Sequence, residues 1–218
     1  MSITAWSYSR LNSYETCPKK YYAVSVAKSV KESESEHTTW GTSVHIAFAS
    51  YLKAGKPLPL QMKQYEKYLA MIKASPGELI VEQKLAINAN YEATGWFDSD
   101  VYCRIISDLT VINGNRAILW DWKTGKPSSD FTQLKISAAV MFQLVPELEL
   151  ITMAYFWTKN KSITRANITR SKAIDLWNEL IPRITRYHEA HVNKEFPPKP
   201  SYLCRYCPVT SCPNWEAR

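Results

Sequence analysis

The sequence has no apolar run that approaches the roughly 20 residues a membrane-spanning helix requires. Its first residues lack the basic and then apolar layout of a secretory signal peptide, so we expect a cytoplasmic protein, in the host cytoplasm if the gene is viral. No internal repeat or low-complexity tract is present. The Walker A motif is also missing, which together with the length of 218 residues argues against a fused helicase.

Positive charge is in surplus, with 27 Lys and Arg residues against 20 Asp and Glu and a formal net charge of +7. Such a surplus suits a polyanionic partner such as nucleic acid, although many soluble proteins are mildly basic. Charge alone therefore favours a DNA partner only modestly. The candidate contacts with phosphates or bases are Arg10, Lys19, Lys20 and Tyr22, with Arg165, Arg170, Lys172, Arg183, Arg186 and Lys199 as further phosphate candidates.

Cysteines are few but clustered, and in a cytosolic protein clustered cysteines are more often metal ligands than disulfide partners. Three of the five occur as Cys204-x2-Cys207-x4-Cys212, so a fourth ligand has to come from elsewhere in the chain. Cys103 lies within a predicted strand and is interpreted as a buried small apolar residue. Four thiolates suit either a structural Zn²⁺ ion or a [4Fe–4S] cluster.

Apolar periodicity divides the chain into a helical part (1–75), a core (76–195) and a tail (196–218). Alternating apolar residues predict strands at 79–87, 101–112, 116–123, 150–158 and 162–169. Asp130 is expected to cap a helix between the third and fourth strands. The last helix begins near Ser171 and is expected to kink at Pro182 and to bury Ile174, Trp177, Ile181, Ile184 and either Tyr187 or His188. This order predicts a mixed α/β domain with a central sheet.

Two carboxylates are expected to meet on the predicted hairpin. If Gly114 and Asn115 form its two-residue loop, residues whose numbers sum to 229 face each other, and Asp108 faces Asp121. Lys123 shares the face of Asp121 because side chains alternate along a strand. Two carboxylates so close repel unless a cation lies between them, and Mg²⁺ or Mn²⁺ suits hard oxygen ligands.

An ordinary surface ion pair between Lys123 and one aspartate is the alternative interpretation, and for an isolated D-x-K it is the commoner case. The second aspartate in a matching register makes the metal-site interpretation about equally probable. Asp98 and Asp100 compete with Asp108 for the role of first carboxylate, but they lie beyond the hairpin register.

The stretch Leu119-Trp120-Asp121-Trp122-Lys123-Thr124-Gly125, preceded by Ser107-Asp108, resembles the RecB-type branch of the PD-(D/E)xK nuclease superfamily. The hallmark of that branch is an aspartate in one strand followed by D-x-K-T-G in the next. D-W-K-T-G is a far more specific match than D-x-K. The resemblance implies that Asp108 and Asp121 hold a divalent metal and that Lys123 assists catalysis.

Other positions match the same branch in order along the chain. The stretch from Gly41 to His45 resembles its G-x-x-x-H helix motif, whose histidine is a metal ligand, and Glu82 matches a frequent acidic position. Gln133 stands where the family places a glutamine after D-x-K, but the tyrosine expected four residues later is Ser137 here, so no tyrosine role carries over. The implied site is His45, Glu82, Asp108 and Asp121 on the metal, with Lys123 and Gln133 beside it.

The fourth cysteine follows from the same resemblance. Cys17-Pro18-Lys19-Lys20-Tyr21-Tyr22 is similar to the iron–sulfur members of the branch, in which one N-terminal cysteine joins three near the C-terminus. CRISPR-associated Cas-four exonucleases and AddB-type helicase–nucleases share this layout. The resemblance extends from Ser7 to Trp215. It favours a [4Fe–4S] cluster over zinc and implies the ligands Cys17, Cys204, Cys207 and Cys212.

Together the residues and the resemblance predict one nuclease domain over 1–218, with a restriction-endonuclease-like α/β core, a helical N-terminal part and an iron–sulfur tail. The expected activity is metal-dependent exonuclease cleavage of single-stranded DNA or DNA ends, in recombination and repair, phage DNA metabolism or CRISPR adaptation, alone or with a protein partner. One alternative is a non-catalytic DNA-binding or assembly subunit with the same fold. The other is a zinc-stabilised interaction module in which D-x-K is incidental.

Overall fold

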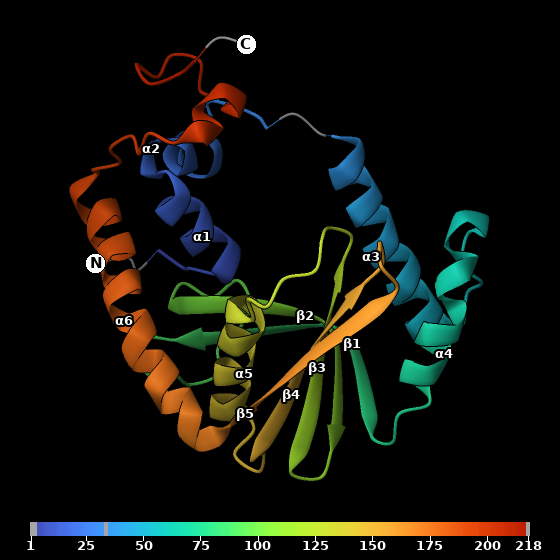
Figure 1. Cartoon of the computed structure of the whole chain (residues 1–218). Helices are drawn as coiled ribbons and strands as arrows, with labels where there is room; N and C mark the ends of the chain where they lie inside the picture. Colours follow the sequence, from blue (N-terminus) through green and yellow to red (C-terminus); the bar gives the residue numbers. More distant parts are fainter. Residues whose placement is uncertain (1–3, 33–34, 217–218) are drawn as a thin grey trace.

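The computed structural model describes residues 4–32 and 35–216 of the chain. At its centre is a five-stranded sheet in the order β1-β2-β3-β4-β5 (Figure 1). The first three strands form an antiparallel meander, β4 lies parallel to β3, and β5 is antiparallel to β4. The predicted mixed α/β sheet is confirmed, with strands at Glu78–Asn88, Val101–Asn113, Arg116–Lys123, Leu150–Trp157 and Ser162–Thr169.

Two of the α-helices begin at a serine whose side chain caps them. The Ser7 side chain accepts a hydrogen bond from the amide of Arg10, and Ser35 and Thr38 form a capping box. The helix expected to be capped by Asp130 has Phe131 as its N-cap and no side-chain cap, although Asp130 accepts a hydrogen bond from the amide of Thr132. Among the described residues no helix is both long and apolar enough to cross a membrane. The helices are α1 (Tyr8–Thr16), α2 (Pro18–Tyr21), α3 (Glu36–Ala54), α4 (Glu66–Lys73), α5 (Thr132–Leu144) and α6 (Arg170–Asn193), with a π-helical turn (Tyr22–Val26) and 3₁₀ turns (Leu60–Tyr65 and Tyr202–Tyr206).

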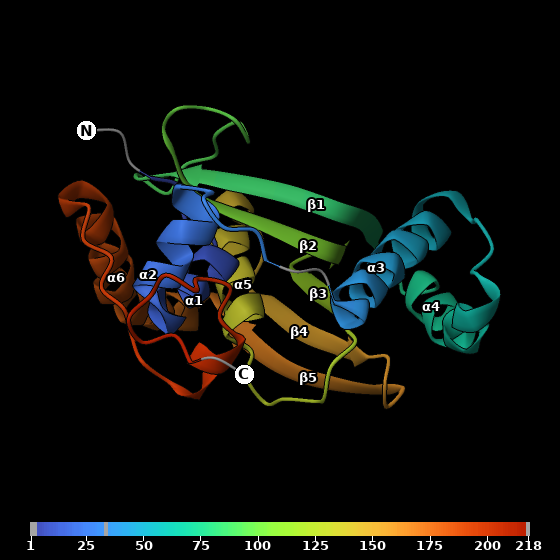
Figure 2. The same cartoon turned by 90° about the horizontal axis from the view of Figure 1, so that it is seen from above.

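Helices cover both faces of the sheet (Figure 2). On one face α3 and α4 pack against the sheet through a core that contains Phe48, Leu69, Trp120 and Trp122. On the other face α5, α6 and α1 form the larger core. The parallel pairing of β3 and β4 requires a crossover connection, and α5 supplies it.

Strand β1 changes the core to which it contributes halfway along its length. Leu79 and Val81 pack against the core under α3 and α4, whereas Leu85 and Ile87 belong to the core under α5 and α6. Between them Glu82 adopts a left-handed conformation with φ 54°. This conformation costs a non-glycine residue roughly 1–2 kcal/mol, so the packing on both sides must hold it in place.

The prediction of which residues the last helix buries was partly wrong. Ile174 and Ile181 are 65% and 43% exposed, and the helix instead buries Leu176, Leu180 and Ala190 together with the predicted Trp177, Ile184 and Tyr187. Many apolar residues surround this helix, so spacing alone does not fix which stripe meets the sheet. The α-helix continues through Pro182.

Arg170 joins the start of α6 to the end of α5, and it is therefore not free to act as the predicted phosphate contact. Its guanidinium donates to the carbonyl oxygens of Phe142, Val145, Pro146 and Leu148 at 2.6–2.9 Å. Carbonyls at a helix end lack intrahelical partners, so the arginine satisfies groups that would otherwise need water.

We expect Arg170→Ala to lower the free energy of unfolding by about 2–4 kcal/mol, because it leaves several half-buried carbonyls without a charged donor. Lys172→Ala is the matched control, since that exposed lysine pairs with Asp175 on the surface and its loss should change stability by less than about 0.5 kcal/mol. Urea unfolding followed by circular dichroism measures both. Equal midpoints for the two variants would contradict the structural role of Arg170.

Candidate metal and catalytic centre

The β2–β3 hairpin has the predicted register, but only as far as Leu109 and Trp120. The next pair, Asp108 opposite Asp121, is not formed. Asp108 Oδ2 instead accepts a hydrogen bond of 2.7 Å from the amide of Trp122. Strands β2 and β3 separate at the level of Glu82. The Asp108 side chain accepts the hydrogen bond from the Trp122 amide in place of a backbone carbonyl of the neighbouring strand.

Three of the four predicted metal ligands lie together. Ligand atoms of His45, Glu82 and Asp108 all lie within 4.8 Å of one another. They come from α3, β1 and β2, so the site depends on the packing of α3 against the sheet. One nitrogen and two carboxylates form a donor set suited to Mn²⁺ or Mg²⁺.

The surroundings of His45 favour a cation at its Nδ1 atom. His45 Nε2 lies 3.0 Å from the carbonyl oxygen of Trp122, which can only accept a hydrogen bond, so Nε2 carries the proton. Nδ1 lies 2.9 Å from Asp108 Oδ1. A neutral imidazole would therefore direct a lone pair at a carboxylate. Either a proton or a metal ion must occupy this position.

The fourth predicted ligand, Asp121, belongs to an adjacent group of side chains. Its Oδ2 lies 2.7 Å from Lys123 Nζ, and its Oδ1 accepts from Gln133 Nε2 at 2.6 Å. Lys123 Nζ in turn donates to Gln133 Oε1 at 2.8 Å. Asp121, Lys123 and Gln133 thus form a closed polar triangle beside the metal-ligand group.

The centre has an excess of negative charge in a buried setting. Burial, followed by the charge of Asp108, raises the pKa of Asp121 to about 6, although Lys123 opposes the shift. Burial and Asp108 also raise the pKa of Glu82. Burial alone would lower the pKa of His45, but its hydrogen bond to Asp108 and the charges of Asp108 and Asp121 raise it. Each shift is one that a bound cation would reverse.

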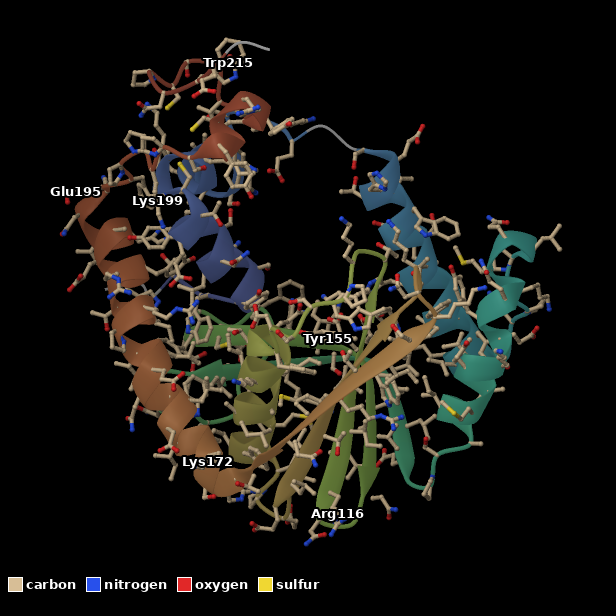
Figure 3. All side chains as sticks on the ribbon, in the orientation of Figure 1. Arg116, Tyr155, Lys172, Glu195, Lys199 and Trp215 are labelled. Atoms are coloured by element: carbon tan, nitrogen blue, oxygen red, sulfur yellow. The ribbon has the colours of Figure 1, made fainter. Side chains whose placement is uncertain are left out.

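Tyr155 was not predicted from the sequence. It pairs with Asp121 across β3 and β4, and its ring centroid lies 5.5 Å from Lys123 Nζ. Tyr155 is labelled in Figure 3. A cation over an aromatic ring is held electrostatically, so Tyr155 helps to orient the lysine. The parallel pairing of β3 with β4 creates this contact, and no local sequence pattern reports it.

The competing aspartates and the predicted nucleic-acid contacts lie outside the centre. Asp98 and Asp100 accept hydrogen bonds from Thr94 within the loop 89–100. Lys20 forms an ion pair with Glu32, and Tyr22 stacks on Phe196. Other predicted contacts have structural partners as well. Arg183 forms an ion pair with the Glu15 carboxylate, and Lys199 Nζ donates a hydrogen bond to the backbone carbonyl of Glu15.

The four predicted cluster ligands line one small cavity. Cys17, at the junction of α1 and α2, faces Cys204, Cys207 and Cys212 of the tail across it. Figure 3 shows the tail, where Lys199 and Trp215 are labelled, above these N-terminal helices. Cys103 is fully buried in β2, as predicted.

Comparison with known proteins adds a family and a fold. The family model described as the PD-(D/E)XK nuclease superfamily matches residues 5–105 and 101–213. A crystal structure of a candidate exonuclease from Eubacterium rectale is similar at a TM-score of 0.53 and 16% identity, over 93% of this chain and 86% of that one. The crystal structure of SSO0001 matches at a TM-score of 0.46 and 16% identity, over 92% and 83%. No curated protein matched the sequence. The five-stranded mixed sheet between helices fits a restriction-endonuclease-like core.

We expect the affinity for Mn²⁺ to fall by about tenfold or more between pH 8 and pH 6. His45, Glu82 and Asp121 have raised pKa values. These side chains are therefore more fully protonated near pH 6 than near pH 8, and a metal ion that binds must displace their protons. Calorimetry in two buffers of different ionisation enthalpy measures the protons released, which should increase as the pH falls. Glu82→Gln should bind Mn²⁺ more weakly and release fewer protons. An affinity that is the same at both pH values would contradict the assignment.

Proposed function

The chain belongs to the PD-(D/E)XK nuclease superfamily, and from this premise we propose that it is a metal-dependent deoxyribonuclease. The proposed substrates are single-stranded DNA and DNA ends, and the proposed mode is exonucleolytic. We further propose that residues 1–218 act as one nuclease domain. The observation that carries this proposal is the convergence of His45, Glu82 and Asp108 next to Lys123.

The residues fit a Mg²⁺ or Mn²⁺ ion, which when bound supplies a Lewis acid and lowers the pKa of a coordinated water. His45, Glu82 and Asp108 would hold it, with Asp121 as a further ligand from the adjacent triangle. The Trp122 carbonyl fixes the tautomer of His45, and the Trp122 amide fixes the orientation of Asp108. These two hydrogen bonds to the backbone of Trp122 hold the His45 and Asp108 side chains in place before any metal binds.

Lys123 supplies the positive charge for the reaction. Protonated lysine has no lone pair for a metal, so its role is to orient a nucleophilic water or to stabilise negative charge on the phosphate. Gln133 holds both Lys123 and Asp121 by hydrogen bonds and thereby limits their motion. The Tyr155 ring lies 5.5 Å from the Lys123 ammonium group and attracts it electrostatically.

Within the superfamily we propose the RecB-type, Cas-four-like branch, on the strength of D-W-K-T-G and the one-plus-three cysteine layout. Its setting would be recombination and repair, phage DNA metabolism or CRISPR adaptation, with or without a protein partner. The proposal is supported by two placements. Asp121 and Lys123 end an inner strand of the sheet, and Cys17 shares a cavity with the tail cysteines.

The cysteine site fits a [4Fe–4S] cluster by its donor set. Four sulfur ligands line one cavity, and the amide of Ser201 approaches Cys204 Sγ at 3.4 Å. Four thiolates also suit a structural Zn²⁺ ion, and the resemblance to the iron–sulfur members of the branch is the ground on which we propose the cluster.

Lys123→Ala should lower the cleavage rate by about 10²–10³-fold and leave Mn²⁺ affinity similar, because it removes a transition-state donor and not a ligand. Asp108→Ala should lose both cleavage and Mn²⁺ binding. Lys126→Ala, an exposed lysine three residues further along the chain, is the control and should match the wild-type protein.

The measurement is digestion of end-labelled DNA with each terminus blocked in turn, which also gives the polarity. If Lys123→Ala cleaves as fast as Lys126→Ala, the role given to Lys123 is wrong. Binding of DNA by the wild-type protein without any cleavage would favour the non-catalytic alternative.

After anaerobic purification the protein should contain iron and acid-labile sulfide. Cys204→Ala should lose both and unfold more easily, because a group bound only by the folded state adds its binding free energy to folding. Cys103→Ala should keep its iron, since that cysteine lies in β2 and away from the tail. Stoichiometric zinc without iron would overturn the cluster.

A further inference from the structure

A cleft of about 640 Å³ lies along α1. We call it the α1 cleft. Gln133 lines it and also forms hydrogen bonds with Asp121 and Lys123, so one residue of the polar triangle borders the cleft. The other lining residues used in the argument are Arg10 of α1, Trp96 of the loop 89–100, and Arg104 and Ile106 of β2.

The cleft follows the strand that carries Asp108. Side chains two residues apart point to the same side of a strand and are ~6.7 Å apart along it, so Ile106 and Arg104 lie roughly 7 and 13 Å from Asp108. Ile106 is 45% exposed. The exposed apolar side chain of Ile106 is thus the next residue on the same side of the strand as the Asp108 carboxylate, and the positive charge of Arg104 follows it.

Trp96 is held in position from two directions. Arg104 Nε donates to its carbonyl oxygen at 2.8 Å, and the Arg104 guanidinium and Lys84 Nζ lie 5.7 and 5.6 Å from its ring centroid. The adjacent turn is closed by Asp98, whose carboxylate accepts from the Gly95 amide at 2.8 Å. Trp96 is thus an aromatic ring with a fixed backbone and two cations near it, and it lines the cleft that Gln133 also lines.

We propose that the α1 cleft binds unpaired nucleotides next to the scissile phosphate, and that Trp96 is a stacking platform for one base. This inference rests on the proposed nuclease function and deepens it. Every base offers a π-face, so stacking on tryptophan is independent of sequence, and the surrounding cations Arg10, Lys84 and Arg104 attract the backbone phosphates. A base in a duplex has both faces covered by its neighbours, so this site selects single strands.

Phe97 supplies the matched control. It is the next residue in the same loop and is 89% exposed, but it does not line the α1 cleft. A general effect of removing an aromatic ring from the loop would affect both positions equally. Loss of a base platform would affect Trp96 alone.

The experiment combines protein variants with substrates that lack one base. Single-stranded oligonucleotides carry one abasic nucleotide, moved along the sequence, and their binding is measured by fluorescence anisotropy with Ca²⁺ in place of Mg²⁺ while cleavage is followed with Mg²⁺. Trp96→Ala should bind intact DNA about 5- to 150-fold more weakly, Phe97→Ala should bind as the wild-type protein does, and Trp96→Phe should recover most of the affinity. For the wild-type protein one abasic position should produce a similar loss, and in Trp96→Ala that position should have no further effect.

The outcomes separate this inference from the nuclease proposal. If the wild-type protein cleaves DNA and Trp96→Ala equals Phe97→Ala, the platform is refuted. An abasic scan of the wild-type protein without any sensitive position refutes it as well, even where Trp96→Ala does not fold. If the scan has the expected sensitive position but no DNA is cleaved, the binding site stands and the nuclease proposal fails.

Discussion

The Asp108 carboxylate is the group on which the arrangement of the centre depends. It is buried, and it links three elements, since it binds the amide of Trp122 in β3 and contacts His45 of α3 from its own position in β2. A buried carboxylate needs such partners because removal from water is otherwise very costly. By accepting a hydrogen bond from the Trp122 amide it ends the pairing of β2 with β3 and opens the sheet where Glu82 and the polar triangle converge. The docking of α3, and with it one of the two cores, is thereby coupled to the geometry of the proposed metal ligands.

The centre is built at the expense of local stability. Glu82 is held in a left-handed conformation, and this half-buried carboxylate lies near the buried Asp108 and Asp121, with one lysine beside them. Strain and like charge of this kind persist only where rigid surroundings impose them, and here both cores do so. A cation that relieves the repulsion would bind a preformed site, so little conformational entropy would be lost on binding.

Local patterns predicted the elements well because they report local physics. The hairpin register followed from the turn at Gly114 and the two-residue period, and it held until tertiary contacts opened the strands. The left-handed turn at Glu82 and the contact of Tyr155 with Lys123 could not be foreseen, since both arise from packing between distant segments. The prediction that the last helix buries Ile174 was wrong for the same reason. The resemblance to a family supplied the proposed roles of single residues, which spacing alone left open.

The first helix has its partners at the other end of the chain. Glu15 of α1 forms an ion pair with Arg183, 168 residues further along the chain. Tyr21 of α2 forms a hydrogen bond with Tyr187, 166 residues further along. During synthesis at ~5–20 residues per second, α1 and α2 would therefore wait roughly 10–30 s on the ribosome before their partners emerge. Until then Cys17 and the side chains that contact α6 lack these partners. The sheet and its metal ligands, which are complete before α6 is made, can assemble first, so the N-terminal helices close over a finished centre.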